Sequence, residues 1–273
     1  EYLDSIILEL INQYDIDGFY FDEPSFQSWC ACDNCKKKFE SEFGEALPTQ
    51  ENWANPLFRE FIVWRYRQIA EWHEHLYEVS KSENRCVFFQ GAFPLARLER
   101  GPIKFSGLEF YHPYAERFGV DWYVLLAHAV DLHHSASIGD VVHFELYRRS
   151  VNEPLWWYGL CLRYGQSISN GKQILVLNMM AQTPFDLYGL SEAELKLSVA
   201  EIIANSGSPL FARYYPDRVD QPAWEIVYGS LREAKRLAPY LSDRESIKYA
   251  AMLFSQPTLE RFDHVPEKVS HLK

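Results

Sequence analysis

The stretch D-G-F-Y-F-D-E-P-S-F-Q-S-W-C-A-C-D-N-C-K-K-K-F, residues 17–39, joins a short apolar segment to two adjacent acids and then to three cysteines. Residues 19–21 are all aromatic, which predicts a buried strand, and Pro24 prevents its simple continuation. Asp22 and Glu23 therefore stand at the carboxyl end of this strand. Adjacent side chains of a strand point to opposite faces, so we expect only one of the two acids to face a site.

Two apolar patterns alternate along the rest of the chain. Apolar residues three and four apart predict helices, and short apolar runs predict buried strands. The expected helices cover residues 3–14, 33–43, 57–81, about 121–135, 154–168, 191–205 and 222–241, and the expected strands cover residues 19–21, 86–90, 141–146, 173–180, 210–214 and 247–254. A capping box at 191–194 opens one helix, and Gly207 is expected to close it. Strands that alternate with amphipathic helices indicate an α/β fold with a parallel sheet.

Functional-looking residues recur where the expected strands end. They are Asp22 and Glu23, Gln90, Glu145, Asn178 and Arg213. A doubly wound sheet would fit this order, but a (β/α)8 TIM barrel fits better, because barrels carry their chemistry at the carboxyl ends of their strands. Only five such strands precede residue 215, so we expect an N-terminally truncated barrel with about strands 4–8. Residues 1–243 are then a partial barrel domain, and residues 244–273 begin a second α/β domain.

Composition excludes some classes of function. Apolar residues make up 47% of the 273 residues, enough for a sizeable core. The net charge is −11 and no basic cluster is longer than residues 36–38, which argues against nucleic-acid binding. No apolar run reaches membrane-spanning length, and a cytoplasmic location is favoured. Aromatic residues make up 16%, and exposed rings around a cleft are suited to stacking on sugars.

Two acids are the main catalytic candidates, Asp22 and Glu145. Glu145 lies in V-V-H-F-E-L, where a carboxylate is costly to bury unless it is paired. Two carboxylates across a barrel mouth are what glycoside hydrolysis needs, one as nucleophile or base and one as general acid. Each acid also has a purely structural alternative. Asp22 could cap the next turn, and Glu145 could form a salt bridge with Arg148 or Arg213. Glu109, in the irregular stretch 92–120, is a further acid.

The cysteines form the pattern C-x-C-x2-C at Cys30, Cys32 and Cys35. Thiolates this close can share one Zn²⁺, which takes four ligands in a tetrahedron. Three candidates remain for the fourth ligand: Cys86, a histidine, or a residue in a part of the protein that precedes this chain. Reduced, unmetallated thiols are the alternative, and the odd total of five cysteines argues against a disulfide framework. We expect a structural zinc and no cofactor for catalysis.

The apolar strand that ends in Asp-Glu, followed by C-x-C-x2-C-x3-F, resembles the fourth-strand region of barrel glycoside hydrolases. The β-galactosidases of glycoside hydrolase family 42 have a zinc-binding cysteine group there. The pattern D-G-F-Y-F-D-E-P with C-A-C-D-N-C is more similar to the group called hypothetical glycosyl hydrolase 6, which includes α-L-fucosidases. Weaker similarities lie at residues 156–165, 191–205 and 249–255. The last resembles the opening strand of a β-galactosidase trimerisation-like, flavodoxin-like domain.

The resemblance also implies catalytic roles. In family 29 α-L-fucosidases the fourth strand ends in W-F-D, whose Asp is the nucleophile. Residues 20–22, Y-F-D, are similar, which implies that Asp22 is the nucleophile and Glu145 the acid/base, with Glu23 and Glu109 as reserves. Family 42 instead places Asn-Glu on strand four and a nucleophilic Glu on strand seven. Here the seventh strand ends in Asn178-Met179, which disfavours a β-galactosidase.

The sequence thus predicts a retaining exo-glycosidase of the α-L-fucosidase-like kind, with a carbohydrate as substrate. The residues expected to contact substrate are Tyr111, His112, Trp156, Asn178 and Arg213. The alternatives are a β-galactosidase-like enzyme, a non-catalytic carbohydrate-binding barrel and a zinc-dependent hydrolase. No nucleic-acid or membrane partner is expected, and a homotrimer is implied only by the resemblance.

Overall fold

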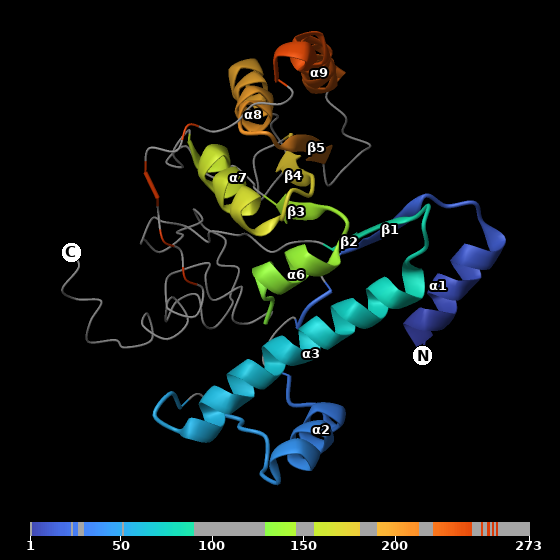
Figure 1. Ribbon diagram of the computed structural model, residues 1–273, viewed down its shortest axis with the longest axis vertical. Helices are drawn as coiled ribbons and strands as arrows, with labels where there is room; N and C mark the ends of the chain where they lie inside the picture. Colours follow the sequence, from blue (N-terminus) through green and yellow to red (C-terminus); the bar gives the residue numbers. More distant parts are fainter. Residues whose placement is uncertain are drawn as a thin grey trace. The chain divides into compact units, whose positions relative to one another are not determined.

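The computed structural model describes residues 2–22, 24–26, 30–50, 52–89, 129–145, 156–180, 190–212 and 221–241, together with residues 247, 250, 251, 253 and 255 (Figure 1). Helices and strands alternate in this part of the chain, which confirms the α/β class. In chain order the elements are α1 (Tyr2–Gln13), β1 (Gly18–Phe21), α2 (Asp33–Phe43), α3 (Pro56–Ser80), β2 (Cys86–Phe89), α6 (Leu132–Ile138), β3 (Val142–Glu145), α7 (Trp157–Ile168), β4 (Ile174–Met179), α8 (Glu192–Ala204), β5 (Ser208–Ala212) and α9 (Gln221–Leu241).

The chain divides into two compact units. The strand unit comprises Glu1–Glu23, His73–Pro94 and Leu132–Ser246. The cysteine unit comprises Pro24–Trp72, Leu95–Asp131 and Ile247–Lys273. The described strands all belong to the strand unit, whereas α2 and the cysteine motif belong to the cysteine unit.

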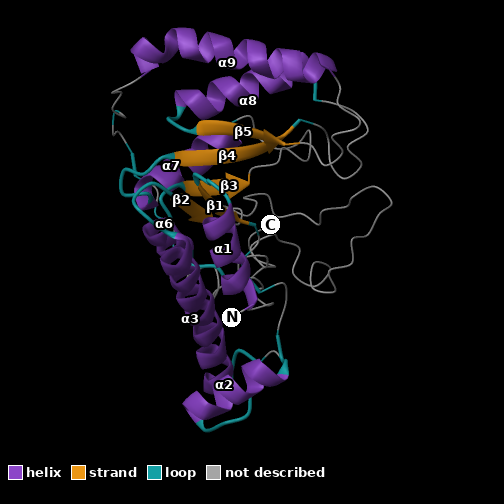
Figure 2. Cartoon of the chain, turned by 90° about the vertical axis from the view of Figure 1, so that its right-hand side faces the viewer, coloured by secondary structure: helices purple, strands orange, loops and turns teal. Residues whose placement is uncertain are grey.

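The strands of the strand unit pair in parallel, as the sequence predicts. β1 pairs with β2, and a three-stranded sheet has the order β3-β4-β5. Figure 2 shows β2 beside β3, so that each described strand neighbours the next one in sequence. Phe21 lies opposite Phe89 and Glu145 lies opposite Leu177, so within each sheet the carboxyl ends meet at one edge. The described strands do not close a barrel.

One face of these strands packs against helices. Phe19 and Phe21 of β1 and Val87 and Phe89 of β2 share a core with Ile7 of α1 and with α3. Further along, Met180 packs with residues of α8 and α9. This face therefore holds the hydrophobic core of the strand unit.

The close packing of α7 on β3 and β4 depends on a glycine. A Cβ on Gly165 of α7 would lie 2.5 Å from the Phe144 ring and 3.1 Å from Ile174. Phe144 of β3 and Ile174 of β4 thus point toward this helix. Glycine is needed because any larger side chain would push the helix off the sheet.

The opposite face carries the alternate residues of the same strands. They include Tyr20 of β1, Phe88 of β2, His143 of β3 and Leu210 of β5. Tyr20 is 41% exposed and Leu210 is 39% exposed, whereas His143 is 2% exposed. Most of these side chains are apolar or aromatic, and the face is only partly covered. His143 is the exception, because it is polar and deeply buried.

Asp140 ties β2 to the segment that opens β3. Its backbone N–H donates to the Val87 carbonyl at 2.8 Å, and its carboxylate accepts from the Val87 N–H at 2.7 Å. The Lys81 ammonium at 2.7 Å and the Tyr77 hydroxyl at 3.0 Å donate to the same carboxylate. Burial raises the pKa of Asp140, but the hydrogen bonds from Lys81, the Val87 amide and Tyr77 outweigh it and hold the pKa below its usual value.

We expect Asp140→Asn to lower the free energy of unfolding by about 1–3 kcal/mol at neutral pH, because hydrogen bonds to a charged group are lost. Since the folded-state pKa is depressed, this stabilisation is complete above the unfolded carboxyl value of about 4 and disappears as the pH falls through the folded-state pKa. Urea unfolding of both proteins across this range measures the difference. Asp15→Asn, at an exposed acid just after α1, is the matched control. A stability difference that does not change with pH would contradict the assignment.

The end of α8 differs in detail from the sequence prediction, while the capping box at its start is confirmed. The residue with left-handed backbone is Ser206, at φ 62°, and not Gly207. The Ser206 N–H donates to the Ile203 carbonyl at 3.0 Å and the Gly207 N–H donates to the Ile202 carbonyl at 2.9 Å, which together form a Schellman motif. Gly207 is required for another reason, because a Cβ there would lie 2.5 Å from Leu162 of α7.

The cysteine unit has a separate aromatic core between α2 and α3. Phe39 of α2 is fully buried against Phe61 and Trp64 of α3. The Trp64 indole N–H donates to the Glu42 carboxylate at 3.1 Å. This core fixes the helix on which the last cysteine of the motif lies.

The predicted strand over residues 247–254 is not seen at the four residues of that range that the structure describes. Two of them, Ile247 and Leu253, are 87% and 93% exposed, so no neighbouring strand packs on them. Within the described ranges, no helix combines the length and the apolar character needed to cross a membrane.

Candidate functional site

Asp22 follows β1 directly, at the carboxyl edge of the β1–β2 pair. Its carboxylate is exposed, and Oδ1 accepts a long hydrogen bond of 3.2 Å from the Tyr20 hydroxyl. Residues two apart share a face of a strand, and Tyr20 lies opposite to the core-facing Phe19 and Phe21. Asp22 therefore stands at the rim of the partly covered face, where the Tyr20 hydroxyl donates to its carboxylate.

Tyr20 is held in place by two rings on neighbouring strands. It stacks on Phe88 of β2 with ring centroids 5.0 Å apart, and it meets the His143 ring of β3 edge-on at 5.2 Å. Phe88 and His143 are themselves 5.9 Å apart. Offset and edge-on geometries are the favourable ones for aromatic pairs. The three strands thus converge on the side chain that touches Asp22.

His143 is the buried member of this group. Both of its ring nitrogens are buried and have no hydrogen-bond partner among the described residues. Burial lowers the pKa of His143 to about 4, so the ring is neutral at physiological pH. A neutral imidazole carries one donor and one acceptor, and both are unused here.

Glu145 is the last residue of β3, and its backbone lies at the carboxyl edge of that sheet. Its side chain lies outside the described part of the chain, so no distance joins it to Asp22. Five other predicted site residues also lie outside the described residues. They are Glu23, Glu109, Tyr111, His112 and Arg213.

The two remaining predicted substrate contacts have different surroundings. Trp156 precedes α7 and is 57% exposed, so its ring is free to stack on a ligand. Asn178 of β4 is fully buried, and its Oδ1 accepts a hydrogen bond of 2.7 Å from the Tyr158 hydroxyl of α7. Asn178 therefore ties β4 to α7 on the helix-packed face of the strands, and this position gives no support to the predicted sugar contact.

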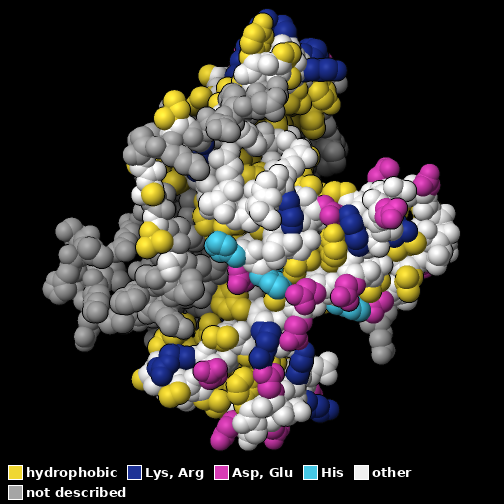
Figure 3. Space-filling model, viewed as in Figure 1, with side chains coloured by type: hydrophobic (Ala, Val, Ile, Leu, Met, Phe, Trp, Pro, Cys, Tyr) yellow, Lys and Arg dark blue, Asp and Glu magenta, His cyan; other side chains and the backbone are white. Residues whose placement is uncertain are grey.

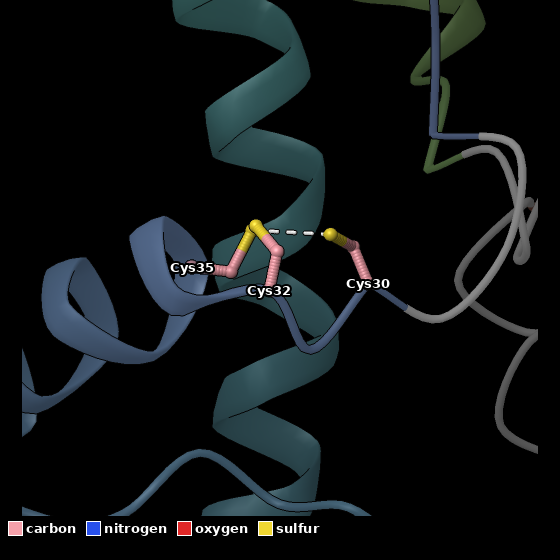
Figure 4. A group of neighbouring side chains, drawn as sticks. All are labelled: Cys30, Cys32 and Cys35. Atoms are coloured by element: carbon pink, nitrogen blue, oxygen red, sulfur yellow. Dashed lines mark hydrogen bonds between the residues drawn. The ribbon is translucent and has the colours of Figure 1, made fainter.

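The three motif cysteines come together as predicted (Figure 4). The sulfur atoms of Cys30, Cys32 and Cys35 all lie within 4.8 Å of one another, and those of Cys30 and Cys35 are 3.5 Å apart. Tetrahedral Zn–S bonds of about 2.3 Å place two thiolates about 3.8 Å apart, so this spacing is compatible with one shared ion. Cys86 is not a member of this group.

Local structure brings the cysteines together. Cys32 is the N-cap of α2, with extended backbone, and Cys35 lies in the first turn, packed against the aromatic core of the cysteine unit. The backbone N–H of Cys35, followed by contacts from Cys30, lowers the pKa of Cys32 to about 7. Burial, followed by the neighbouring thiols, raises the pKa of Cys35 to about 12. Three soft donors in one place fit a structural metal better than a reaction centre.

Sequence reasoning did not single out Tyr20 or His143 as site residues. The sequence did contain a signal for them. Tyr20 lies two residues before Asp22, and His143 lies two residues before Glu145, so each shares a strand face with a candidate acid. Their convergence could not be read from the sequence, since it depends on how β1, β2 and β3 are arranged side by side.

Comparisons with known proteins give a limited result. No protein-family model matches the sequence, and no curated protein matches it. Among solved structures, bee venom hyaluronidase is similar at 14% identity and a TM-score of 0.47, over 84% of this chain and 73% of that one. The same enzyme in complex with a hyaluronic acid tetramer is similar at 15% identity and a TM-score of 0.48, over 86% of this chain and 72% of that one.

Proposed function

We propose that the strand unit is part of the (β/α)8 barrel of a retaining glycoside hydrolase, with Asp22 as nucleophile and Glu145 as general acid/base. The observation that carries this is the placement of Asp22. It is an exposed carboxylate at the carboxyl edge of parallel strands, and it lies on the face opposite to the one that packs against the described helices. In barrel enzymes this edge is where catalytic residues stand.

Two features favour a barrel over a doubly wound sheet. Among the described strands, successive ones are spatial neighbours, without the reversal of strand order that a doubly wound sheet contains. The described core clusters also place helices on one face of the strands, whereas a doubly wound sheet is covered on both faces. The partly covered face of Tyr20 and Leu210 would then be the barrel interior, and further strands would close the barrel and contribute side chains to it.

The chemistry would proceed in two steps. The Asp22 carboxylate attacks the anomeric carbon while Glu145 donates its proton to the leaving oxygen, so the glycosidic bond breaks and a glycosyl ester forms. Glu145, now a carboxylate, then takes a proton from water, and the oxygen of this water displaces Asp22 to release the sugar. The hydrogen bond from the Tyr20 hydroxyl would hold the Asp22 carboxylate in position for attack.

For the substrate, we propose an α-L-fucosidase-like exo-glycosidase. The support is the sequence resemblance around Asp22 and the end of β4. A β-galactosidase of the family 42 kind would need a Glu at the end of strand seven, but β4 ends at Asn178-Met179. An α-linked L-fucose as the sugar and a homotrimer as the assembly are proposed on the same resemblance.

The cysteine triad is proposed to hold a structural Zn²⁺ that takes no part in the catalytic chemistry. Cys30, Cys32 and Cys35 would supply three thiolates, and the ion would stabilise the turn into α2. Residues 244–273 are proposed to begin a second, flavodoxin-like domain.

A screen of aryl glycosides with the full-length protein tests the proposal. We expect turnover of at least one neutral aryl glycoside, and retention of anomeric configuration in the first-formed sugar by NMR. Sugar binding without turnover of any glycoside would instead favour a non-catalytic carbohydrate-binding barrel. An inverted product would contradict the assignment of Asp22 as nucleophile.

A further inference from the structure

His143 poses an energetic problem that packing does not solve. Its ring is 2% exposed, and neither nitrogen has a hydrogen-bond partner among the described residues. Leaving a buried donor or acceptor unpaired costs about 1–3 kcal/mol, and such groups in folded proteins call for a specific cause. A phenylalanine would fill the same aromatic setting without this cost.

The surroundings of His143 limit which groups can form hydrogen bonds with its ring nitrogens. The edge of Tyr20 and the tilted ring of Phe88 are its neighbours on the strand face, and neither donates or accepts a hydrogen bond with it. Through Tyr20 the ring belongs to the same group as Asp22, because the Tyr20 hydroxyl bonds Asp22. The unused donor and acceptor therefore belong to a residue on the same strand face as Asp22.

The chemistry of the groups around His143 favours a hydroxyl group as its partner. A neutral imidazole offers one donor and one acceptor, and a hydroxyl group both donates and accepts. An anionic group would favour a protonated, charged ring or a neighbouring cation, and none of the described residues on this strand face is Lys or Arg. Aromatic walls such as Tyr20 and Phe88 suit the apolar face of a sugar ring.

We propose that His143 is a specificity-determining residue that hydrogen-bonds a hydroxyl of a neutral sugar bound at Asp22. The proposal rests on the glycosidase function above and adds to it the residue that recognises a neutral sugar and disfavours a uronic acid. His143 acts on binding and does not take part in proton transfer.

The test compares His143→Phe with the full-length parent protein. We expect His143→Phe to be at least as stable in urea, because an unsatisfied buried group is removed. Its Kd for the best neutral monosaccharide, measured by calorimetry, and its KM for the matching aryl glycoside should each rise about 5- to 10-fold, the effect of one lost neutral hydrogen bond. His143→Gln, which keeps a donor and an acceptor, should recover part of this loss. His133→Phe, at an exposed histidine of α6, is the control.

Deoxy sugars identify the hydroxyl. One monodeoxy analogue should bind the parent protein about 5- to 10-fold more weakly, yet bind His143→Phe as well as the complete sugar does. Unchanged sugar affinity in a folded His143→Phe protein, while the parent still turns over glycosides, overturns this proposal alone. Equal or tighter binding of a uronic acid overturns the choice of neutral sugars. If the parent neither binds nor hydrolyses any sugar, both this proposal and the glycosidase function fall.

Discussion

Asp22→Asn is expected to lower kcat on an aryl glycoside on the order of 10⁴-fold, because the nucleophile is lost while the shape of the site is kept. The amide of Asn is a poor nucleophile, but it can still accept the hydrogen bond from the Tyr20 hydroxyl. KM should change little, since Asp22 acts mainly in the transition state. Steady-state kinetics on the full-length protein measure both constants.

The controls for Asp22→Asn separate chemistry from folding. Asp15→Asn lies in the same N-terminal segment and should leave kcat unchanged, because Asp15 is an exposed acid between α1 and β1. Asp22 is also exposed, so its substitution should change the urea midpoint very little. Parent-like kcat in Asp22→Asn would show that another acid performs the attack.

Cys32→Ser and Cys35→Ser are expected to lose bound zinc and to destabilise the cysteine unit. The parent protein should contain about one zinc per chain by elemental analysis, and either substitution should remove most of it. We expect the free energy of unfolding of the zinc-loaded protein to fall on the order of 3 kcal/mol or more, because metal binding energy contributes directly to folding. Chelation of the parent should produce the same loss.

The matched control for this experiment is Cys86→Ser. Cys86 opens β2, is exposed and is not a member of the cysteine group, so zinc content should not change. A structural role also predicts that the folded fraction of Cys32→Ser keeps its kcat. Full zinc content in Cys32→Ser, or no zinc in the parent, would refute the metal site. A loss of kcat without loss of stability would favour a catalytic metal instead.

The sequence predicted most described elements because their local signals agree with the tertiary structure. The strand at residues 86–90 and the helices at residues 33–43 and 57–81 match β2, α2 and α3 within one or two residues. Apolar periodicity sufficed there, because one side of each element packs into a core.

The differences arise where tertiary context decides. β5 begins at Ser208, two residues before the predicted start, although Pro209 has no N–H to donate. Proline is tolerated because β5 pairs only with β4 within the described residues, which makes it an edge strand there. The helix expected at about 121–135 appears as α6, Leu132–Ile138, and residues 121–128 lie outside the described part.

The candidate site was predictable to the extent that it is local in sequence. The cysteine spacing placed three sulfurs together, and the strand ending placed Asp22 at the carboxyl edge. The burial of Asn178 was not predictable, because a one-residue difference in strand position moves a side chain from one face to the other. The grouping of Tyr20 with His143 depends on strand neighbours more than a hundred residues apart.

The most direct test of the central claim is to trap the nucleophile. The full-length enzyme is inactivated with a 2-deoxy-2-fluoro glycoside of the sugar it hydrolyses best, digested with a protease and examined by mass spectrometry. We expect one glycosylated peptide, with the sugar attached to Asp22, and none in Asp22→Asn. A label on another peptide, including one that contains Glu145, would contradict it.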